Sequence, residues 1–562
     1  MAQSDGGFVR VGYRYQLTLT HLLEDSAKLY PRQEIVYRDK VRYSYAEFYE
    51  RCRRLSGGLE SVGVGRGSRV GVLEWNTHRH LEAYFAVPCM GAVLHSINPY
   101  LPPEELAYVI NHAEDEVLLL SEDFVPLCER IRGRLKSVKA YVIMGDGGAP
   151  EARLEPAYEY EELLRSSPRY EYPELDEEQV ATLCYTSGTT GPPKGCFFTH
   201  RALSLHTLVW AACLPRVGVD VVSDAILHLV PMYHVHSWGY PYIGFFHGMK
   251  HILPGRFDPK AVLELIRRES RPGRRIFTAC VATVARRLFY HPEVGSYREC
   301  LKSLVVNIGG GPLPEGLARR MEELGVRFFS GWGMTEAAPI MGMCMPKSHM
   351  ADWPEEEKFK FRLKTGWAPP FSEQRVVDEE GRDVEPDGRH VGEVVYRSPW
   401  ATPGYYKDPK RSEELWRGGW MHTGDVATMD EERCIHIVDR AKDLIKSGGE
   451  WISSIKLEAL LSTHPKVFEA AVVGVPSEEW GERPIALAVP APGAELTEGE
   501  LREHLMKCVE EGVIPKWWIP DAFIVVDEIP KTGTGKFDKK AIRERLREAL
   551  AKGGSARPPS AR

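Results

Sequence analysis

The chain has 562 residues, of which 43% are hydrophobic and 27% charged, a composition typical of a soluble globular protein but a length too great for one core. Its formal net charge of −7 offers no basic surface for nucleic acid. No leader pattern opens the chain, no run of about eighteen apolar residues occurs, and the eleven cysteines form no CxxC pair. We therefore expect a cytoplasmic protein without a membrane span or a disulfide framework.

Helix-like and strand-like stretches alternate early in the chain. Apolar residues recur at steps of four and three in 45–63, which predicts an amphipathic helix. Further predicted strands and helices follow at 70–73, 78–89, 92–95, 103–112 and 116–120. The same rhythm returns at 226–330, so we expect two α/β halves with parallel sheets. The stretch 145–178 has no steady period and predicts a long surface connection.

The character of the sequence changes after residue 370. Three strand-like runs between charged turns predict a small β-rich subdomain: Gln374–Val377, Val391–Arg397 and Cys434–Val438. Beyond Lys442, helix and strand patterns mix over about 120 residues, as in a compact α+β lid. We expect an N-terminal domain at 1–441, a mobile C-terminal lid at 442–552 and a flexible tail at 553–562.

The rest of the chain is organised around the stretch 185–195, which reads YTSGTTGPPKG. It follows the apolar run 180–184, which predicts a buried parallel strand. Backbone N–H groups and hydroxyl side chains in such a loop can surround an anion, and the glycines allow the backbone to approach it closely. With one lysine beside them, we expect a polyphosphate site. No Walker A spacing fits here. The candidate residues are Thr186, Ser187, Gly188, Thr189, Thr190, Gly191 and Lys194.

Two later stretches suit the remainder of a nucleotide. NIGGGP at 307–312 follows an apolar strand and offers bare backbone to an adenine ring. In SGWGMTE at 330–336, Trp332 can stack on a base or belong to the core, Thr335 can bond a phosphate, and Glu336 can hold Mg²⁺. The candidate residues are Gly309, Gly310, Gly311, Pro312, Gly331, Trp332, Gly333, Met334, Thr335 and Glu336.

These motifs resemble those of the adenylate-forming superfamily, which includes acyl-CoA synthetases, adenylation domains and luciferases. The signature TSGTTGxPKG is unbroken, SGWGMTE matches the xGYGxTE element with Trp in place of Tyr, and 439–454 reads DRAKDLIKSGGEWISS. The resemblance covers nearly the whole chain. It implies ATP and coenzyme A as co-substrates, Mg²⁺ held by Thr189 and Glu336, and a lid that rotates between two half-reactions.

The resemblance also implies roles for three charged residues outside the glycine-rich motifs. Asp425 would accept from the ribose hydroxyls, and Arg440 would contact the ribose or a phosphate. Lys536 would reach across the cleft to the reacting carboxylate and the α-phosphate, where an ammonium offsets the negative charge that gathers in the transition state. Lys539 and Lys540 are expected to lie in solvent.

Further along the same stretch, the resemblance implies a moving part. Lys442 would be the hinge about which the lid turns, and the turn would bring 447–451 to the channel for the thiol. The residues implied in binding the nucleotide or coenzyme A here are Val438, Lys446 and Trp451.

The acid is expected beside 229–242, LVPMYHVHSWGYPY. His234 can donate to a carboxylate oxygen, and His236 is expected to be structural. The HVxxW pattern resembles that of bacterial and archaeal medium- or long-chain fatty-acyl-CoA synthetases, which adds Trp238 and Gly239 as substrate residues. The aromatic residues that follow fit either the wall of an acyl tunnel or plain core: Tyr240, Tyr242, Phe245 and Phe246.

The resulting prediction is an AMP-forming fatty acid–CoA ligase whose catalytic residues are Lys536, His234, Glu336 and Thr335. The expected partners are small molecules only, and a homodimer is left open. One alternative is a ligase for short, branched or hydroxylated acids such as 4-hydroxybutyrate. Others are transfer to a carrier-protein thiol and a non-catalytic homologue that binds acyl-adenylate or lipid.

Overall fold

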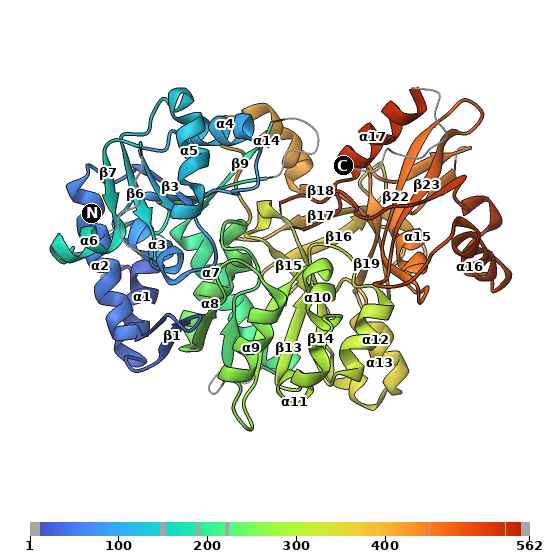
Figure 1. Ribbon diagram of the computed structural model, residues 1–562, viewed down its shortest axis with the longest axis horizontal. Coiled ribbons are helices and arrows are strands. Elements are labelled where there is room, and N and C mark those ends of the chain that lie inside the picture. The colour runs from blue at the N-terminus through green and yellow to red at the C-terminus, as the bar shows by residue number, and fades with distance from the viewer. Residues whose placement is uncertain are drawn as a thin grey trace, which may run out of the picture.

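The computed structural model describes residues 12–146, 153–186, 192–219, 224–448, 450–533 and 535–551. Within them the chain forms four β-sheets, two of them large and mainly parallel (Figure 1). The predicted fold class is confirmed: two α/β subdomains and a small β-rich subdomain precede a C-terminal α+β part. The predicted loop residues 187–191 and the predicted tail lie outside the described residues.

The first large sheet carries the ends of the phosphate loop. Every pair of neighbouring strands within this sheet is parallel except β8 and β9, which are antiparallel. Since β8 ends at Tyr185 and β9 begins at Gly195, the loop joins two adjacent strands at one edge of the sheet. The strand order is β7 (Ala157–Glu159), β6 (Ala140–Met144), β5 (Val117–Ser121), β3 (Arg69–Leu73), β4 (Val93–Ser96), β8 (Val180–Tyr185), β9 (Gly195–Thr199).

The second large sheet carries the two predicted nucleotide motifs. Its strands β13 and β14 are parallel neighbours, so NIGGGP and SGWGMTE meet at the carboxyl edge, where open α/β sheets bind ligands. Two strands from the start of the chain complete the far edge. The order is β15 (Ile340–Met343), β14 (Arg327–Gly333), β13 (Leu304–Ile308), β12 (Ile276–Cys280), β10 (Ala225–Leu227), β11 (Lys250–Leu253), β1 (Glu34–Tyr37), β2 (Val41–Ser44).

Helices cover both large sheets. The helix predicted at 45–63 is α2, which begins with a capping box between Ser44 and Glu47. The prediction of a surface connection at 145–178 was wrong in part, because β7 and α6 lie there and are too short to show a period. The helices are α1 (Leu19–Leu29), α2 (Tyr45–Ser61), α3 (His78–Cys89), α4 (Pro103–Ala113), α5 (Val125–Ile131), α6 (Tyr160–Ser166), α7 (His200–Cys213), α8 (Tyr240–His247), α9 (Pro259–Glu269), α10 (Ala282–Phe289), α11 (Arg298–Leu301), α12 (Glu315–Glu323), α13 (Glu355–Arg362), α14 (Pro409–Leu415).

Two smaller sheets follow in the sequence. The β-rich subdomain is an antiparallel sheet of β16 (Glu373–Val377), β17 (Val391–Arg397), β18 (Met421–Met429) and β19 (Ile435–Arg440). The C-terminal part, orange to red in Figure 1, is built from β20 (Ile445–Ser447), β21 (Glu450–Ile452), α15 (Ser454–Leu461), β22 (Val467–Ser477), β23 (Gly481–Pro490), α16 (Glu498–Glu510), β24 (Ala522–Val525) and α17 (Lys539–Ala551).

The C-terminal part has its own hydrophobic interior. Two clusters of buried apolar side chains draw all their members from residue 445 onward, and the other clusters draw theirs from earlier residues. Separate interiors of this kind are what independently folding domains have. Among the described residues, no helix combines the length and the apolar character needed to cross a bilayer.

Candidate active site

Lys194 and Glu336, the predicted phosphate lysine and metal carboxylate, are joined through one hydroxyl. The backbone N–H of Thr186 donates to the carbonyl of Lys194 at 2.9 Å and closes the base of the phosphate loop. Lys194 Nζ donates to the hydroxyl of Tyr405 at 2.9 Å and lies 4.2 Å from the centre of its ring. That hydroxyl donates to Glu336 Oε1 at 2.7 Å. Tyr405 is not among the residues predicted from the sequence.

Trp332, Asp425 and Arg440 form a second connected group. Trp332 Nε1 donates to Asp425 Oδ2 at 2.9 Å, and Arg440 Nε lies 2.9 Å from Asp425 Oδ1. Asp425 faces Arg440 across β18 and β19, so the two strands fix this ion pair. Trp332 and Asp425 are both buried. The structure therefore brings the predicted base platform and the predicted ribose acceptor into direct contact.

The glycines of SGWGMTE are needed for packing. A Cβ at Gly333 would lie 1.9 Å from the carbonyl oxygen of Pro339, and one at Gly331 would lie 2.6 Å from Asn307 Oδ1. No side chain fits at either distance. Met334 is half-buried and Thr335 is buried, next to Glu336.

Lys536 lies against the glycine run 309–311. Gly310 has φ +75°, and a Cβ there would lie 3.0 Å from Lys536 Cε and 3.6 Å from Nζ. The neighbouring Gly309 is covered by the indole of Trp238, 3.0 Å from its Cβ position, whereas Gly311 is open and exposed, as is Pro312. The bare backbone predicted for an adenine ring is thus partly covered by two side chains.

The loop that carries Lys536 is held to the N-terminal part by hydroxyls. Tyr233 donates to the carbonyl of Gly533 at 3.0 Å, and Thr283 donates to that of Gly535 at 2.8 Å. Burial lowers the pKa of Lys536 to about 8, and the positive charges of Arg440 and Lys442 lower it too. Lys536 therefore lies near other cations, where bound anions would stabilise its charge.

His234 lies at the start of an unusual turn. Burial lowers its pKa to about 3 and the charge of Lys536 acts in the same direction, so the ring is neutral near pH 7. After it, Val235 to Trp238 all have positive φ, between 29° and 58°, and Gly239 follows at 78°. His236 is buried and bonds Thr182 Oγ1 at 2.7 Å through Nε2, in agreement with its expected structural role.

The aromatic residues after this turn differ in burial. Tyr242 and Phe245 are buried, and Phe245 stacks on Tyr45 at 4.6 Å, so these two belong to the core. Phe246 is 39% exposed and forms no part of an inner wall. The side chains behind the turn leave only a gap of about 160 Å³ that is too narrow for a water molecule, between Ile226, Leu227, His228, Leu229, Val230, Ser237, Tyr240, Phe277 and Ala279.

The residues of the implied hinge and thiol channel lie beyond β19. Lys442 is exposed, and Lys446 and Trp451 are exposed on the β20–β21 hairpin, with Lys446 Nζ 5.4 Å from the Trp451 ring centre. The Val438 carbonyl accepts from Ser453 Oγ at 2.6 Å. Of these residues, Lys442 is near enough to Lys536 for its positive charge to lower the pKa of that lysine.

The two lysines that follow the Lys536 loop differ from each other. Lys540 is exposed, as predicted. The prediction for Lys539 was wrong, because its Nζ lies 2.8 Å from Glu458 Oε1 and donates to Ser454 Oγ at 2.6 Å.

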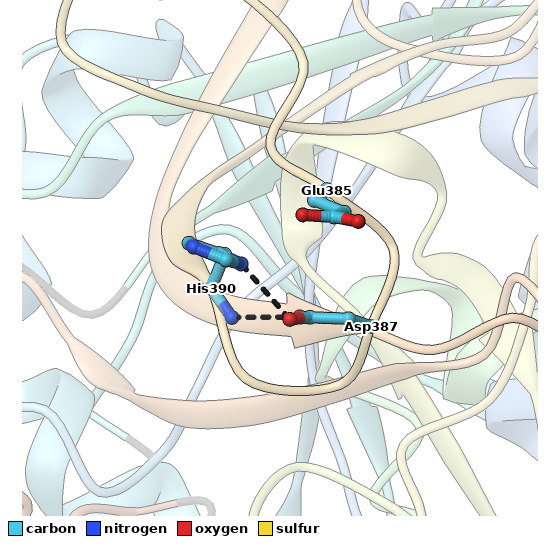
Figure 2. A group of neighbouring side chains, drawn as sticks. All are labelled: Glu385, Asp387 and His390. Atoms are coloured by element: carbon cyan, nitrogen blue, oxygen red, sulfur yellow. Dashed lines mark hydrogen bonds and ion pairs between the residues drawn. The ribbon is translucent and has the colours of Figure 1, made fainter.

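A group of potential metal ligands lies elsewhere, on the hairpin between β16 and β17. Figure 2 shows Glu385, Asp387 and His390, whose ligand atoms lie within 4.8 Å of one another. Asp387 accepts from the backbone N–H groups of Arg389 and His390 and bonds His390 Nδ1 at 3.0 Å, which holds its pKa below the usual value. All three side chains are exposed, and their contacts close the turn.

Comparison with known proteins gives matches to both parts of the chain. The family model described as "AMP-binding enzyme" matches residues 23–406, and that of the "AMP-binding enzyme C-terminal domain" matches 456–536. The chain is 46% identical to a long-chain-fatty-acid–CoA ligase of Thermus thermophilus over 95% of this chain and 96% of the relative. It is 37% identical to a medium-chain-fatty-acid–CoA ligase of Ectopseudomonas oleovorans over 97% and 98% of the two chains.

Solved structures are similar over nearly the full length. An anthranilate CoA ligase in complex with anthranoyl-AMP has a TM-score of 0.85 at 24% identity, over 96% of this chain and 99% of that one. ATP-bound MatB of Rhodopseudomonas palustris has a TM-score of 0.80 at 24% identity, over 94% and 99%. At these identities the likeness supports the fold alone.

Proposed function

The chain belongs to the family of AMP-binding enzymes and is an AMP-forming acyl-CoA ligase, and from this premise we propose which residues carry its chemistry and which acid it activates. In the first half-reaction the acid's carboxylate attacks the α-phosphorus of ATP and pyrophosphate leaves. In the second, the thiol of coenzyme A displaces AMP from acyl-AMP. The mixed anhydride supplies a leaving group that a carboxylate lacks.

Lys194 and Glu336 take the triphosphate side of the nucleotide. Lys194 pairs with a phosphate oxygen at the end of the loop, and Thr335 donates to a phosphate. Glu336 offers a buried carboxylate oxygen, the hard ligand that Mg²⁺ prefers, so the donor fits this ion. Mg²⁺, when bound, neutralises charge on the phosphates. Thr189, its other proposed ligand, lies outside the described residues.

Asp425, Trp332 and Arg440 take the nucleoside side. The base stacks on Trp332, whose edge is fixed by its hydrogen bond to Asp425. The Asp425 carboxylate accepts from the ribose hydroxyls, and the ion pair with Arg440 holds that carboxylate in position.

The position of Lys536 over Gly310 is the observation that best supports this assignment. It puts an ammonium from the C-terminal part close to His234 and to the charges of Arg440, Asp425 and Glu336. There it offsets the repulsion between an attacking carboxylate and the α-phosphate. A neutral His234 donates its ring N–H to a carboxylate oxygen.

The same lysine closes the side from which a thiol must approach, so the C-terminal part has to move between half-reactions. We place the domain boundary at 441/442 and the hinge at Lys442, whose exposed turn links β19 to β20. Rotation brings Lys446 and Trp451 to the channel for coenzyme A.

A medium- or long-chain fatty acid is the proposed substrate, with Trp238 and Gly239 beside its carboxyl end. Support comes from the two relatives named as fatty-acid–CoA ligases. We place the protein in the cytoplasm, since all eleven cysteines are free and ten are buried. A homodimer stays a prediction.

Three assays on purified protein test the proposal. Fatty acids should stimulate exchange of labelled pyrophosphate into ATP, and hydroxylamine should trap the acyl-AMP. A series of straight-chain acids from butyrate to stearate, together with 4-hydroxybutyrate, should give the highest coenzyme A-dependent turnover for medium or long chains. A maximum at the shortest or hydroxylated acids would reject the proposed acid while leaving the reaction intact.

A further inference from the structure

The segment 400–408 ties two distant parts of the candidate site together. It lies between β17 and α14 and has little regular structure. The backbone N–H of Thr402 donates to the carbonyl of Glu336 at 2.7 Å, and Thr402 Oγ1 donates to the carbonyl of Phe197 in β9 at 3.1 Å. The N–H of Tyr406 donates to the carbonyl of Gly195, also in β9, at 2.7 Å. One segment therefore fixes Glu336 relative to the strand that leaves the phosphate loop.

Tyr405 is placed by these bonds with its hydroxyl between two opposite charges. Its side chain is buried, and its own N–H donates to Ser412 Oγ at 2.8 Å. The hydroxyl accepts from Lys194 and donates to Glu336, so one neutral group uses both its lone pair and its proton. Hydrogen bonds to charged groups are stronger than those between neutral groups, and hydrogen bonds linked in a chain polarise and strengthen one another.

We propose that Tyr405 is a positioning residue for Mg·ATP: its hydroxyl keeps Lys194 and Glu336 apart and aims the first at phosphate and the second at the metal ion. This inference rests on the roles proposed above for those two residues. Without the hydroxyl, the ammonium and the carboxylate are free to approach and pair directly. A direct pair would satisfy each charge internally and would compete with both phosphate and Mg²⁺.

Tyr405→Phe removes the hydroxyl and keeps the ring that packs under Lys194. Tyr406→Phe is the matched control, because its hydroxyl donates to Glu114 at 3.3 Å, outside the Lys194–Glu336 chain. Calorimetric titration of the full chain with ATP at a series of Mg²⁺ concentrations measures binding without any acid. Calorimetry also separates stoichiometry from affinity, so partial misfolding cannot imitate a weaker Kd.

Tyr405→Phe should raise the Kd for ATP at saturating Mg²⁺ by about tenfold, the loss expected for one hydrogen bond to a charged group, and should raise the Mg²⁺ concentration for half-maximal binding. Tyr406→Phe should stay within about twofold of wild type for both. Unchanged ATP and Mg²⁺ affinity in Tyr405→Phe, with or without a lower Tm, would overturn this inference alone, as would equal weakening in both variants. Failure of the wild type to bind ATP would overturn the proposed nucleotide site as well.

Discussion

Replacing Lys536 with methionine tests the charge of this side chain separately from its packing. The alkyl stem lies against Gly310, and methionine fills nearly the same space. The loop keeps two other anchors, the hydrogen bonds from Tyr233 and Thr283 to its carbonyls. The variant should therefore still dock and lose only the ammonium. Loss of one preorganised electrostatic group typically costs on the order of 10²–10³ in rate, or ~2.7–4 kcal/mol of transition-state stabilisation.

The two half-reactions should respond differently. Acyl-AMP formation, followed by pyrophosphate exchange, should fall by about 10²–10³. Thioester formation from synthetic acyl-AMP and coenzyme A should be nearly unchanged, because Lys536 has then left the site. Lys540→Met is the control, because Lys540 is exposed and its ion pair with Glu544 is long, at 4.0 Å. Equal loss in both half-reactions, or a full rate of acyl-AMP formation, would refute the role given to Lys536.

Three further outcomes follow from the same geometry. Asp425→Asn removes the charge paired with Arg440. In steady-state assays it should raise the KM for ATP by about tenfold with little change in Tm. An unchanged KM would contradict the role of Asp425 in binding the ribose. Lys442→Pro fixes φ at the hinge and should slow thioester formation more than adenylation in single-turnover experiments, and equal slowing would count against the hinge. The lowered pKa of Lys536, about 8, means that its ammonium is lost as pH rises through that value, so kcat/KM for adenylation should decline about tenfold per pH unit above it. A profile that stays flat to pH 10 would exclude a requirement for the charged form.

Motifs confined to a few neighbouring residues made most of the candidate site predictable. Lys194, Trp332 and Glu336 each lie in a stretch short enough for the residue types alone to suggest phosphate, base or metal binding. The two large sheets were predictable for a similar reason, since alternating helix and strand patterns specify βαβ units. The pairing of β1 and β2 with the second sheet was not, because nothing local indicates which sheet a strand will join.

Tyr405 could not have been found in this way. Its contact with Lys194 spans 211 positions and depends on the path of the segment 400–408, while a single tyrosine in a sequence looks like any core residue. Lys539, by contrast, left a signal that went unused. It precedes Ile542 and Leu546 by three and seven positions on α17, and both of these are buried, so all three lie on the inner face of that helix.

The separate hydrophobic interior of the C-terminal part has a consequence for turnover. Every member of its two apolar clusters lies within that part, so the proposed rotation leaves these clusters intact. The proposed rotation would break the hydroxyl-to-carbonyl bonds from Tyr233 and Thr283, which water replaces at little cost, and would separate Arg286 from the ring of Phe468, whose centre lies 5.5 Å away. The proposed rotation would therefore change which surface of the C-terminal part faces the N-terminal part while the interior of the C-terminal part stays packed.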